Sequence, residues 1–268
     1  MRIGSELGFF QPQQRLDMLG NNAANVGTVG FKTQIDEAAQ AFEPLEMNAN
    51  VAQYGGGQGA IGGASYFGPR SDFKQGPIAD TGNPWDLALT GAGFFQVTGD
   101  NGDVLYTRAG NFHLDGAGRL TDAGGRLLQL TDAQGQVLNP PPVLPSDATN
   151  IAVQADGTVT TVSQGNKLTL GRISLALFSN PNGLLQREGT LYQATRESGA
   201  AIQGVAGNPS GNGNVAFGAI RSGALEQSNV DLAGTMLSLI QAQRAYQLEA
   251  RMVKQNDEMW GQANAIRR

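Results

Sequence analysis

The sequence predicts an α+β protein in which N- and C-terminal helices pair as a coiled-coil-like unit and a mostly antiparallel β module is inserted between them. Three observations predict this class. Apolar residues recur at helical spacing near both ends, short alternating segments fill the middle, and Asp–Gly turns separate those segments. Because a two-helix unit buries little apolar surface alone, packing among copies is the natural way to complete it.

The N-terminal helix is predicted from steps of three and four residues. Its series is Phe9, Pro12, Leu16, Leu19, Ala23 and Val26. A proline costs about 3 kcal/mol inside a helix but is tolerated in the first turn, so we expect the helix to begin or kink near Pro12. Asn25 and Gly27 tolerate positive φ and are expected to end it. A second helical stretch is expected from about Lys32 to Phe42.

Between the helices the composition changes from loop to short strands. Residues 55–63 are rich in glycine and are expected to form a loop. From about residue 73 to 222 the predicted strands are 87–89, 94–97, 104–107 and 111–114, with an alternating pair of segments over 168–177. Predicted turns separate them at 99–102, 115–118, 122–125, 132–135 and 156–157. Many short strands at this spacing favour a barrel or sandwich.

The C-terminal helix has the strongest signal of the chain. Alternating steps of four and three residues define a mostly apolar seam with a flanking stripe. These residues are Leu232, Met236, Leu239, Gln243, Tyr246, Ala250, Val253, Asp257 and Trp260, with Leu237 and Ile240 beside them. Ser228 and Asn229 are expected to cap the helix, and Asp231 to lie in its first turn. Over residues 230–265 it would span about 54 Å at ~1.5 Å per residue, which suggests a helix that needs partners.

These signals divide the chain into three parts. Residues 1–34 and 229–268 are predicted to form a terminal helical core. Residues 35–72 and 222–228 are predicted to connect it, through the glycine-rich loop, to a β-rich domain over 73–221.

Composition excludes several classes of function. The chain has no cysteine and one histidine, which excludes disulfides, thiolate chemistry and multi-His metal sites. A net charge of -5 lacks the basic footprint of a nucleic-acid-binding protein, and no apolar run approaches the ~18 residues that span a bilayer. Only 15% of the residues are charged, which suits copies that pack against each other. We expect no cofactor and no cleaved signal peptide, because no charged region precedes an apolar run at the N-terminus.

Motifs that could carry chemistry are weak. The G-x-G-x-x-G match at 57–62 is not followed by a helix, so it does not indicate nucleotide binding. The Asp–Gly clusters lack the calcium-loop register and indicate hairpin turns instead. His113 lies in an alternating segment and is expected to be structural or solvated. Asp80 and Asp86 flank a turn but show no cleft of the kind that glycoside hydrolysis needs.

Four stretches in order resemble the bacterial flagellar rod and hook protein family. The first, 21–32, reads Asn-Asn-Ala-Ala-Asn-Val-Gly-Thr-Val-Gly-Phe-Lys, close to the family's N-terminal signature. The others are 86–97, 106–120 and 223–246. Within the family, the length of the chain and the stretch Gln-Ala-Gln-Arg-Ala-Tyr look most like the distal rod protein. Alanine stands at position 23, where the family usually has Leu or Ile.

The resemblance implies a tubular homopolymer that transmits torque and forms an export channel. Terminal helices would line the inner tube and β modules the outer wall. Implied partners are further copies of the chain, the proximal rod proteins, the hook protein and the surrounding outer ring (bushing) proteins. The implied location is the flagellar basal body, in the periplasmic or extracytoplasmic space, reached through the flagellar type III apparatus.

Subunit packing is then expected to rest on both helices and on the signature. The expected residues are Leu16, Leu19, Asn21, Asn22, Asn25, Val26, Phe31, Leu232, Met236, Leu239, Ile240, Gln243, Tyr246, Val253 and Trp260. The asparagines have two interpretations, helix termination and polar contact between subunits. Gly30 is expected to allow a sharp exit that Phe31 anchors. Tyr106, Arg108 and Phe112 are expected to pack within the β module rather than to carry chemistry.

Other functions remain open at this level. Alternatives within the family are the proximal rod paralogue and another hook-basal body protein. Outside it, residues 73–222 could form a secreted β-rich binding module, or Asp80 and Asp86 could serve a cell-wall enzyme. We expect no enzymatic activity.

Overall fold

The computed structural model describes residues 4–35, 70–99, 102–132, 134–145, 149–207 and 216–266. Contacts between residues group the chain into two compact units. The helical unit consists of the described parts of 1–20, 34–72 and 236–268, and the β unit of the described parts of 21–33 and 73–235. Residues 21–33, which carry most of the N-terminal signature, therefore group with the strands and not with the helices.

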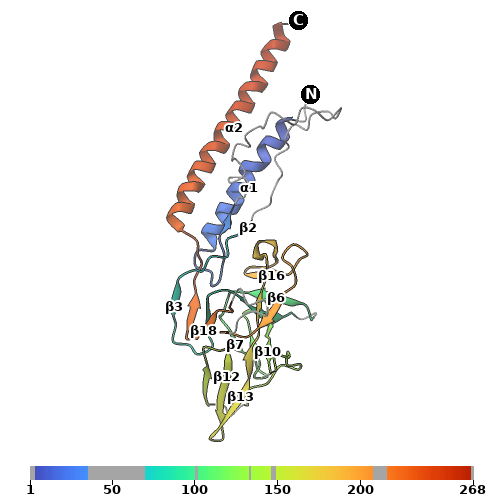
Figure 1. Cartoon of the computed structure of the whole chain (residues 1–268). Coiled ribbons are helices and arrows are strands. Elements are labelled where there is room, and N and C mark those ends of the chain that lie inside the picture. The colour runs from blue at the N-terminus through green and yellow to red at the C-terminus, as the bar shows by residue number, and fades with distance from the viewer. Residues whose placement is uncertain are drawn as a thin grey trace, which may run out of the picture. The chain divides into compact units, whose positions relative to one another are not determined.

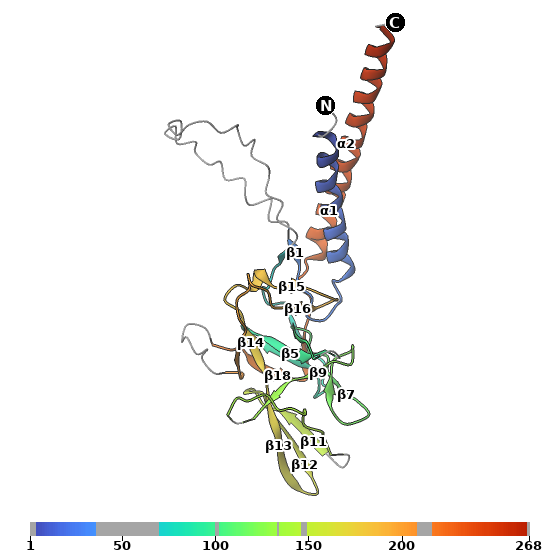
Figure 2. The ribbon, with the colours of Figure 1, turned by 90° about the vertical axis from the view of Figure 1, so that its right-hand side faces the viewer.

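The helical unit is built on two helices, α1 (Gly4–Ala24) and α2 (Leu232–Ile266). The two helices lie side by side in both views of the ribbon (Figures 1 and 2). Met18, Leu19 and Ala242 are buried together, and Leu16 and Leu239 pack against them. The α+β class with two helices and mostly antiparallel sheets is thus confirmed. No helix in the described part of the chain is apolar over a length that would cross a membrane.

The boundaries of α1 differ from the prediction at one end. The helix begins at Gly4 and continues through Pro12, so the expected start there is wrong. A proline removes one N–H from the helix, and α1 continues past that single lost hydrogen bond. At the other end α1 stops at Ala24, immediately before Asn25 and Gly27, as predicted, although neither of these residues adopts the expected positive φ.

Asp231 caps α2, in place of the predicted Ser228 and Asn229. Its Oδ1 accepts a hydrogen bond from the backbone N–H of Ala233 at 3.1 Å, and its carbonyl accepts from the Thr235 hydroxyl at 2.6 Å. The first of these bonds satisfies an N–H group that has no partner within the helix. The Asn229 side chain is used elsewhere, in the β unit.

The second helical stretch expected over 32–42 is wrong at its beginning. Gln34–Ile35 form strand β1, which pairs antiparallel with β2 (Arg70–Ser71). Residues 36–42 and the glycine-rich loop at 55–63 lie outside the described residues. Two residues are too few to show the alternation that predicts a strand. The hydrogen bonds of β1 also come from a segment 35 positions away, which no local pattern reveals.

The β unit is antiparallel throughout its described pairings. Its strands are β3 (Ile78–Asp80), β4 (Leu87–Thr90), β5 (Phe94–Thr98), β6 (Val104–Thr107), β7 (His113–Leu114), β8 (Leu120–Thr121), β9 (Leu127–Leu128), β10 (Leu130–Thr131), β11 (Thr149–Val153), β12 (Thr158–Ser163), β13 (Asn166–Ile173), β14 (Leu175–Leu177), β15 (Leu185–Gln186), β16 (Leu191–Gln193), β17 (Ile202–Gly204), β18 (Ala219–Ser222) and β19 (Ala224–Glu226). A 3-10 turn, η2, covers Pro181–Gly183.

These strands form one large sheet and several small ones. The nine-stranded sheet has the order β15-β16-β6-β5-β9-β8-β7, with β14 joining β5 to β17. A four-stranded sheet has the order β10-β13-β12-β11, and β18-β4 and β19-β3 are two-stranded. The strands predicted at 87–89, 94–97 and 104–107 are present, whereas the one at 111–114 is reduced to His113–Leu114.

The core of the β unit lies between these sheets. Its largest fully buried side chains include Leu87, Leu89, Phe95, Val97 and Ile173. A second cluster is aromatic, with Phe94, Tyr106, Phe178 and Tyr192 in edge-to-face contact at centroid distances from 4.8 to 6.1 Å. Both clusters come from residues that alternate along the strands, as the pattern predicted.

Three hairpin loops repeat one device, an aspartate followed three residues later by glycine. In each, Oδ1 of the aspartate accepts backbone N–H groups two and four residues later, at 2.8 to 2.9 Å. The aspartates are Asp115, Asp122 and Asp132. The glycines have φ between 78° and 82°, which a side chain would oppose. These loops are turns, as predicted.

The carboxyl of Asp115 is expected to titrate below its ordinary pKa. The backbone N–H of Arg119 is the largest cause, since it donates to the charged form, and the Arg119 guanidinium and the Ala117 N–H add to it. Because this pKa is lower in the folded chain than in the unfolded chain, the ionised carboxyl stabilises the loop at pH values above the ordinary pKa. The stabilisation is lost as the pH falls through the lowered pKa of the folded chain. NMR of the carboxyl carbon against pH measures the midpoint. Arg119→Ala keeps the backbone N–H, so part of the lowering of the Asp115 pKa should remain. An ordinary pKa for Asp115 in the unsubstituted chain would contradict the prediction.

Candidate subunit-packing site

Helix α2 carries two apolar faces. One face contains Leu239 and Ala242, which contact α1. The other contains side chains that are well over half exposed: Leu237 (59%), Leu248 (58%), Met252 (60%) and Met259 (65%). At 3.6 residues per turn these four fall within an arc of about 60°, on the opposite side of the helix from Leu239. We call Leu237, Leu248, Met252 and Met259 the outer face of α2.

The outer face is largely absent from the sequence-based seam. That seam follows the phase of Leu239, and only Leu237 was included as part of a flanking stripe. The signal was present, because positions 237, 248, 252 and 259 differ by 11, 4 and 7 residues, which are whole numbers of helical turns to within a fraction. The predicted seam follows one line of apolar residues along the helix, and the outer face forms a second line on another side.

The structure brings only part of the predicted packing set together. Leu16, Leu19 and Leu239 share the buried cluster between the helices. Other members on α2 are at least a third exposed, namely Leu232, Met236, Ile240, Tyr246 and Val253. Gln243 is exposed, Val26 is half-buried in the β unit, and the side chain of Trp260 lies outside the described residues.

The asparagines of the signature close the end of α1. The Asn25 amide donates to the carbonyl of Asn21 at 2.9 Å, and the Thr28 hydroxyl donates to Asn25 Oδ1 at 3.0 Å. Carbonyls in the last turn of a helix lack partners, so these bonds support helix termination. Asn21 is exposed and Asn22 is buried. A polar contact of these residues with another subunit stays a prediction.

The end of the signature enters the β unit as a buried charge cluster. Phe31 is 2% exposed, and the side chains of Lys32 and Glu226 are fully buried. Lys32 Nζ lies 2.6 Å from Glu226 Oε1, and Arg108 Nη1 lies 3.2 Å from Glu226 Oε2. We call Lys32, Arg108 and Glu226 the junction cluster. It joins three parts of the chain that are far apart in sequence.

Backbone groups add three hydrogen bonds to the cluster, and Arg108 Nε is left buried without a partner among the described residues. The backbone N–H of Gly76 donates to Glu226 Oε1 at 2.9 Å, and Lys32 Nζ donates to the carbonyl of Lys74 at 2.7 Å. Arg108 Nη2 donates to the carbonyl of Gly91 at 2.8 Å. Buried charges are tolerated when paired and hydrogen-bonded in this way.

Arg108 also contacts the aromatic cluster. Its guanidinium lies 5.4 Å from the centroid of the Phe94 ring, within range of a cation–π contact. Burial lowers the pKa of Arg108, and the Glu226 carboxylate opposes that shift. Sequence reasoning assigned Arg108 to packing and did not single out Glu226. No spacing rule connects positions 32, 108 and 226.

Gly30 permits the signature to approach this cluster. Its φ is 68°, and a Cβ placed on it would lie 2.4 Å from the backbone nitrogen of Ala109. The backbone N–H of Gly30 donates to the carbonyl of Glu226 at 2.8 Å. The sharp exit anchored by Phe31 therefore rests on a left-handed residue in contact with backbone.

Gly30→Ala is expected to destabilise the β unit by more than about 2 kcal/mol, because the methyl group adds a backbone clash to the strain of positive φ. Gly102→Ala is the matched control. Gly102 has φ 81° with open space around it, so that variant has only the strain. Urea unfolding followed by far-UV circular dichroism compares the two. Equal losses would show that the clash with Ala109 is relieved at no cost.

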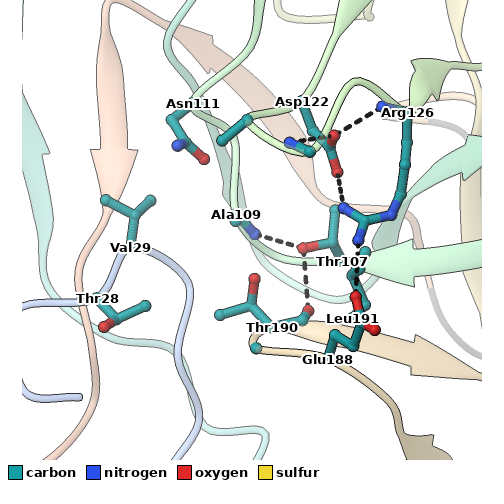
Figure 3. A pocket seen from close by; sticks show the side chains of 13 residues that line it. Thr28, Val29, Thr107, Ala109, Asn111, Asp122, Arg126, Glu188, Thr190 and Leu191 are labelled. Carbon is teal, nitrogen blue, oxygen red and sulfur yellow. Dashed lines mark hydrogen bonds and ion pairs between the residues drawn. The ribbon is translucent and has the colours of Figure 1, made fainter. Parts of the chain in front are cut away.

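A shallow hollow lies beside the signature. It has a volume of about 360 Å³ and lies against Thr28 and Val29 (Figure 3). On its far side Arg126 bonds to Asp122 at 3.1 Å and approaches Glu188 at 3.4 Å. Its charged groups therefore already pair with each other.

The carboxylates considered for a cell-wall enzyme are engaged at the surface. Asp80 pairs with Arg221 at 2.7 Å, and Asp86 accepts a hydrogen bond from the Asn83 amide at 3.2 Å. Among the described residues, no three His, Asp or Glu side chains come close enough to hold a metal ion.

Comparisons with known proteins decide the family. Residues 88–161 match the model of the flagellar hook protein FlgE/F/G D1 domain, and residues 221–266 match that of the flagellar basal body rod FlgEFG protein C-terminal. The flagellar basal-body rod protein FlgG of Bacillus subtilis is 34% identical over 92% of this chain and 91% of its own. The chain belongs to the flagellar basal-body rod protein family. It is a structural subunit of the rod.

Other relatives also align with this chain over nearly its whole length. FlgG of Agrobacterium fabrum is 31% identical over 94% of this chain and 93% of its own. The flagellar hook-basal body complex protein FlhP of Bacillus subtilis is 28% identical over 96% and 95%. The crystal structure of Helicobacter pylori flagellar hook protein FlgE2 covers 47% of this chain and 29% of its own, at 18% identity and a TM-score of 0.24, which is too low to bear on the fold.

The two family matches divide the junction cluster of the rod subunit. Arg108 lies in the first match and Glu226 in the second, whereas Lys32 precedes both. The second match also contains the whole of α2 with its outer face.

Proposed function

We propose that this chain is the distal-rod subunit and that the outer face of α2 is the surface through which copies polymerise. α1 and α2 pair as a coiled-coil-like unit, and a neighbouring copy covers the outer face. The single observation that carries the proposal is the outer face itself, whose four side chains are each well over half exposed on a helix already packed on its other side.

Physical magnitudes support association through this face. Burying a Leu-sized side chain contributes roughly 1.5 to 3 kcal/mol, so four of them per subunit outweigh a substantial entropic cost of ordering. A helix of 35 residues also exceeds what α1, with 21 residues, can cover.

A third face of α2 suits the wall of a channel. Beyond Gln243 it carries Arg244, Gln247, Arg251, Lys254 and Glu258, all exposed. At 3.6 residues per turn these lie beside the outer face, within an arc of about 80°. We assign this polar face to the export channel and the β units to the outer wall. The tube would transmit torque between proximal rod and hook proteins, inside the surrounding ring proteins, in the periplasm.

Deletion of residues 232–266 tests the proposal. We expect the truncated chain to stay folded and soluble and to fail to polymerise, since it keeps the β unit and loses the packing helix. Cells that carry it should lack a distal rod and should not swim. Normal rods built from the truncated chain would overturn the proposal.

Cryo-electron microscopy of basal bodies decides between the distal rod and its paralogues. Tracing this chain into the tube between the proximal rod and the hook, with α2 at the channel, supports the distal assignment. Tracing it only into the short proximal segment would contradict the distal assignment and leave the family unchanged. Its absence from the basal body would favour a binding module.

A further inference from the structure

We propose that the junction cluster, together with Asn229 and Thr33, is the mechanical joint of the subunit. It ties the segment by which the chain enters the β unit from α1 to the segment by which it leaves toward α2. We call residues 30–33 the incoming segment and residues 226–229 the outgoing segment. The role of this joint in transmitting torque along the rod rests on the proposed function. Its resistance to force within a single subunit is independent of that function.

Backbone and side-chain bonds connect the two segments directly. The Gly30 N–H donates to the Glu226 carbonyl at 2.8 Å, and the Lys32–Glu226 ion pair lies beside it. Asn229 Oδ1 accepts from both the backbone N–H and the hydroxyl of Thr33, at 2.7 and 2.8 Å. Each residue of the pair 32–33 is therefore held by a side chain of the outgoing segment.

A third segment closes the joint. The carbonyl of Lys74 accepts from Lys32 Nζ at 2.7 Å and from the Asn229 amide at 3.0 Å. The N–H of Gly76 donates to Glu226, and a Cβ on Gly76 would lie 2.1 Å from the carbonyl oxygen of Gln227. Backbone therefore packs on backbone here, with no room for a side chain between the segments.

Chain connectivity places the joint under load. Along the chain, residues 25–29 join α1 to the incoming segment, and residues 230–231 join α2 to the outgoing segment. The incoming and outgoing segments are the first bonded elements on both routes. Separating the helices pulls on these bonds before it pulls on the large sheet.

Burial makes the ion pair suitable for this task. The side chains of Lys32 and Glu226 are both 0% exposed, so water cannot replace either partner until the segments have separated. The exposed pair between Arg221 and Asp80 differs in this respect, since 54% and 69% of those side chains are exposed. Exposed pairs exchange partners with water and contribute little.

Constant-force pulling on single full-length chains tests the joint in two geometries. The chain has no cysteine, so introduced cysteines give unique handles. Handles at Gln13→Cys in α1 and Gln262→Cys in α2 put the joint in the force path. Handles at Gln134→Cys and Asn182→Cys, both exposed in the β unit, leave it out.

Glu226→Gln is expected to shorten the lifetime of the folded β unit by at least about tenfold with the helix handles, because contacts broken in the rate-limiting step set the unfolding rate. With the internal handles its lifetime should change little. Arg221→Ala, the ion-pair control, should change neither. Equal shortening in both geometries would show that these bonds break in the rate-limiting step whichever way the force is applied, and would overturn the proposal, as would no shortening with the helix handles.

Asn229→Ala gives a second variant if Glu226→Gln does not fold. It keeps all charges and removes the bonds to Thr33 and Lys74. We expect a smaller shortening that is again confined to the helix handles. A lifetime unchanged in that geometry would overturn the joint. Failure of the rod to polymerise would leave these single-chain results unaffected, so the two proposals can fail separately.

Discussion

Leu248→Asp is expected to abolish polymerisation while leaving the subunit folded. Leu248 lies on the outer face of α2 with 58% of its side chain exposed, so in the single subunit the new carboxylate stays in water. Surface substitutions of this kind change the free energy of unfolding by roughly 0.5 kcal/mol or less. In the polymer the same carboxylate would be buried against a neighbour without a partner, which costs several kcal/mol at every subunit.

Gln247→Asp is the matched control for this prediction. It introduces the same charge one position away, on the polar face assigned to the channel. Sedimentation and negative-stain electron microscopy measure the polymer, and thermal unfolding measures the subunit. Polymers of normal length from Leu248→Asp would place the subunit contact elsewhere on the chain. Loss of polymer in Gln247→Asp as well would show that charge alone, and not the outer face, is responsible.

Glu226→Gln is expected to lower the free energy of unfolding of the β unit by about 3 to 5 kcal/mol, as is typical when one partner of a buried ion pair is removed. The carboxylate that both Lys32 and Arg108 contact is lost, whereas the amide oxygen can still accept from Gly76. The volume of the side chain is almost unchanged, so the effect reports charge rather than packing.

The exposed pair between Arg221 and Asp80 provides the comparison for Glu226→Gln. Arg221→Ala breaks an ion pair of similar length in the same unit, and a loss of about 0 to 1 kcal/mol is expected. Urea unfolding monitored by tryptophan fluorescence gives both values. A loss under 1 kcal/mol for Glu226→Gln would mean that water enters the cluster and solvates its cations.

Local pattern accounts for what could be predicted. The helical ends follow from apolar residues three and four positions apart, and β4, β5 and β6 from apolar runs bounded by Asp–Gly turns. The turns themselves are local, since each aspartate bonds to backbone only two and four residues away. The resemblance at 21–32 pointed to the family that the comparisons then showed.

The wrongly predicted start of the first helix and cap of the second helix also have local causes. The first helix was predicted to begin or kink at Pro12, whereas α1 begins at Gly4. The low helix propensity of proline is a weak prior, which the neighbouring turns of the helix can override. The cap was assigned to Ser228 and Asn229, whereas Asp231 caps α2. Several residues near a helix start can serve as a cap, and only the actual backbone course selects one.

The sequence by itself determined the class of fold, the family, the helical ends and the turns of the β unit, because each depends on residues within a few positions of one another. Only the tertiary structure decided that residues 21–33 group with the strands, that Lys32, Arg108 and Glu226 meet, and that α2 has an outer face left uncovered. The physical reason is separation along the chain. Contacts between positions 32, 108 and 226 leave no period in the sequence and exist only once the chain has folded.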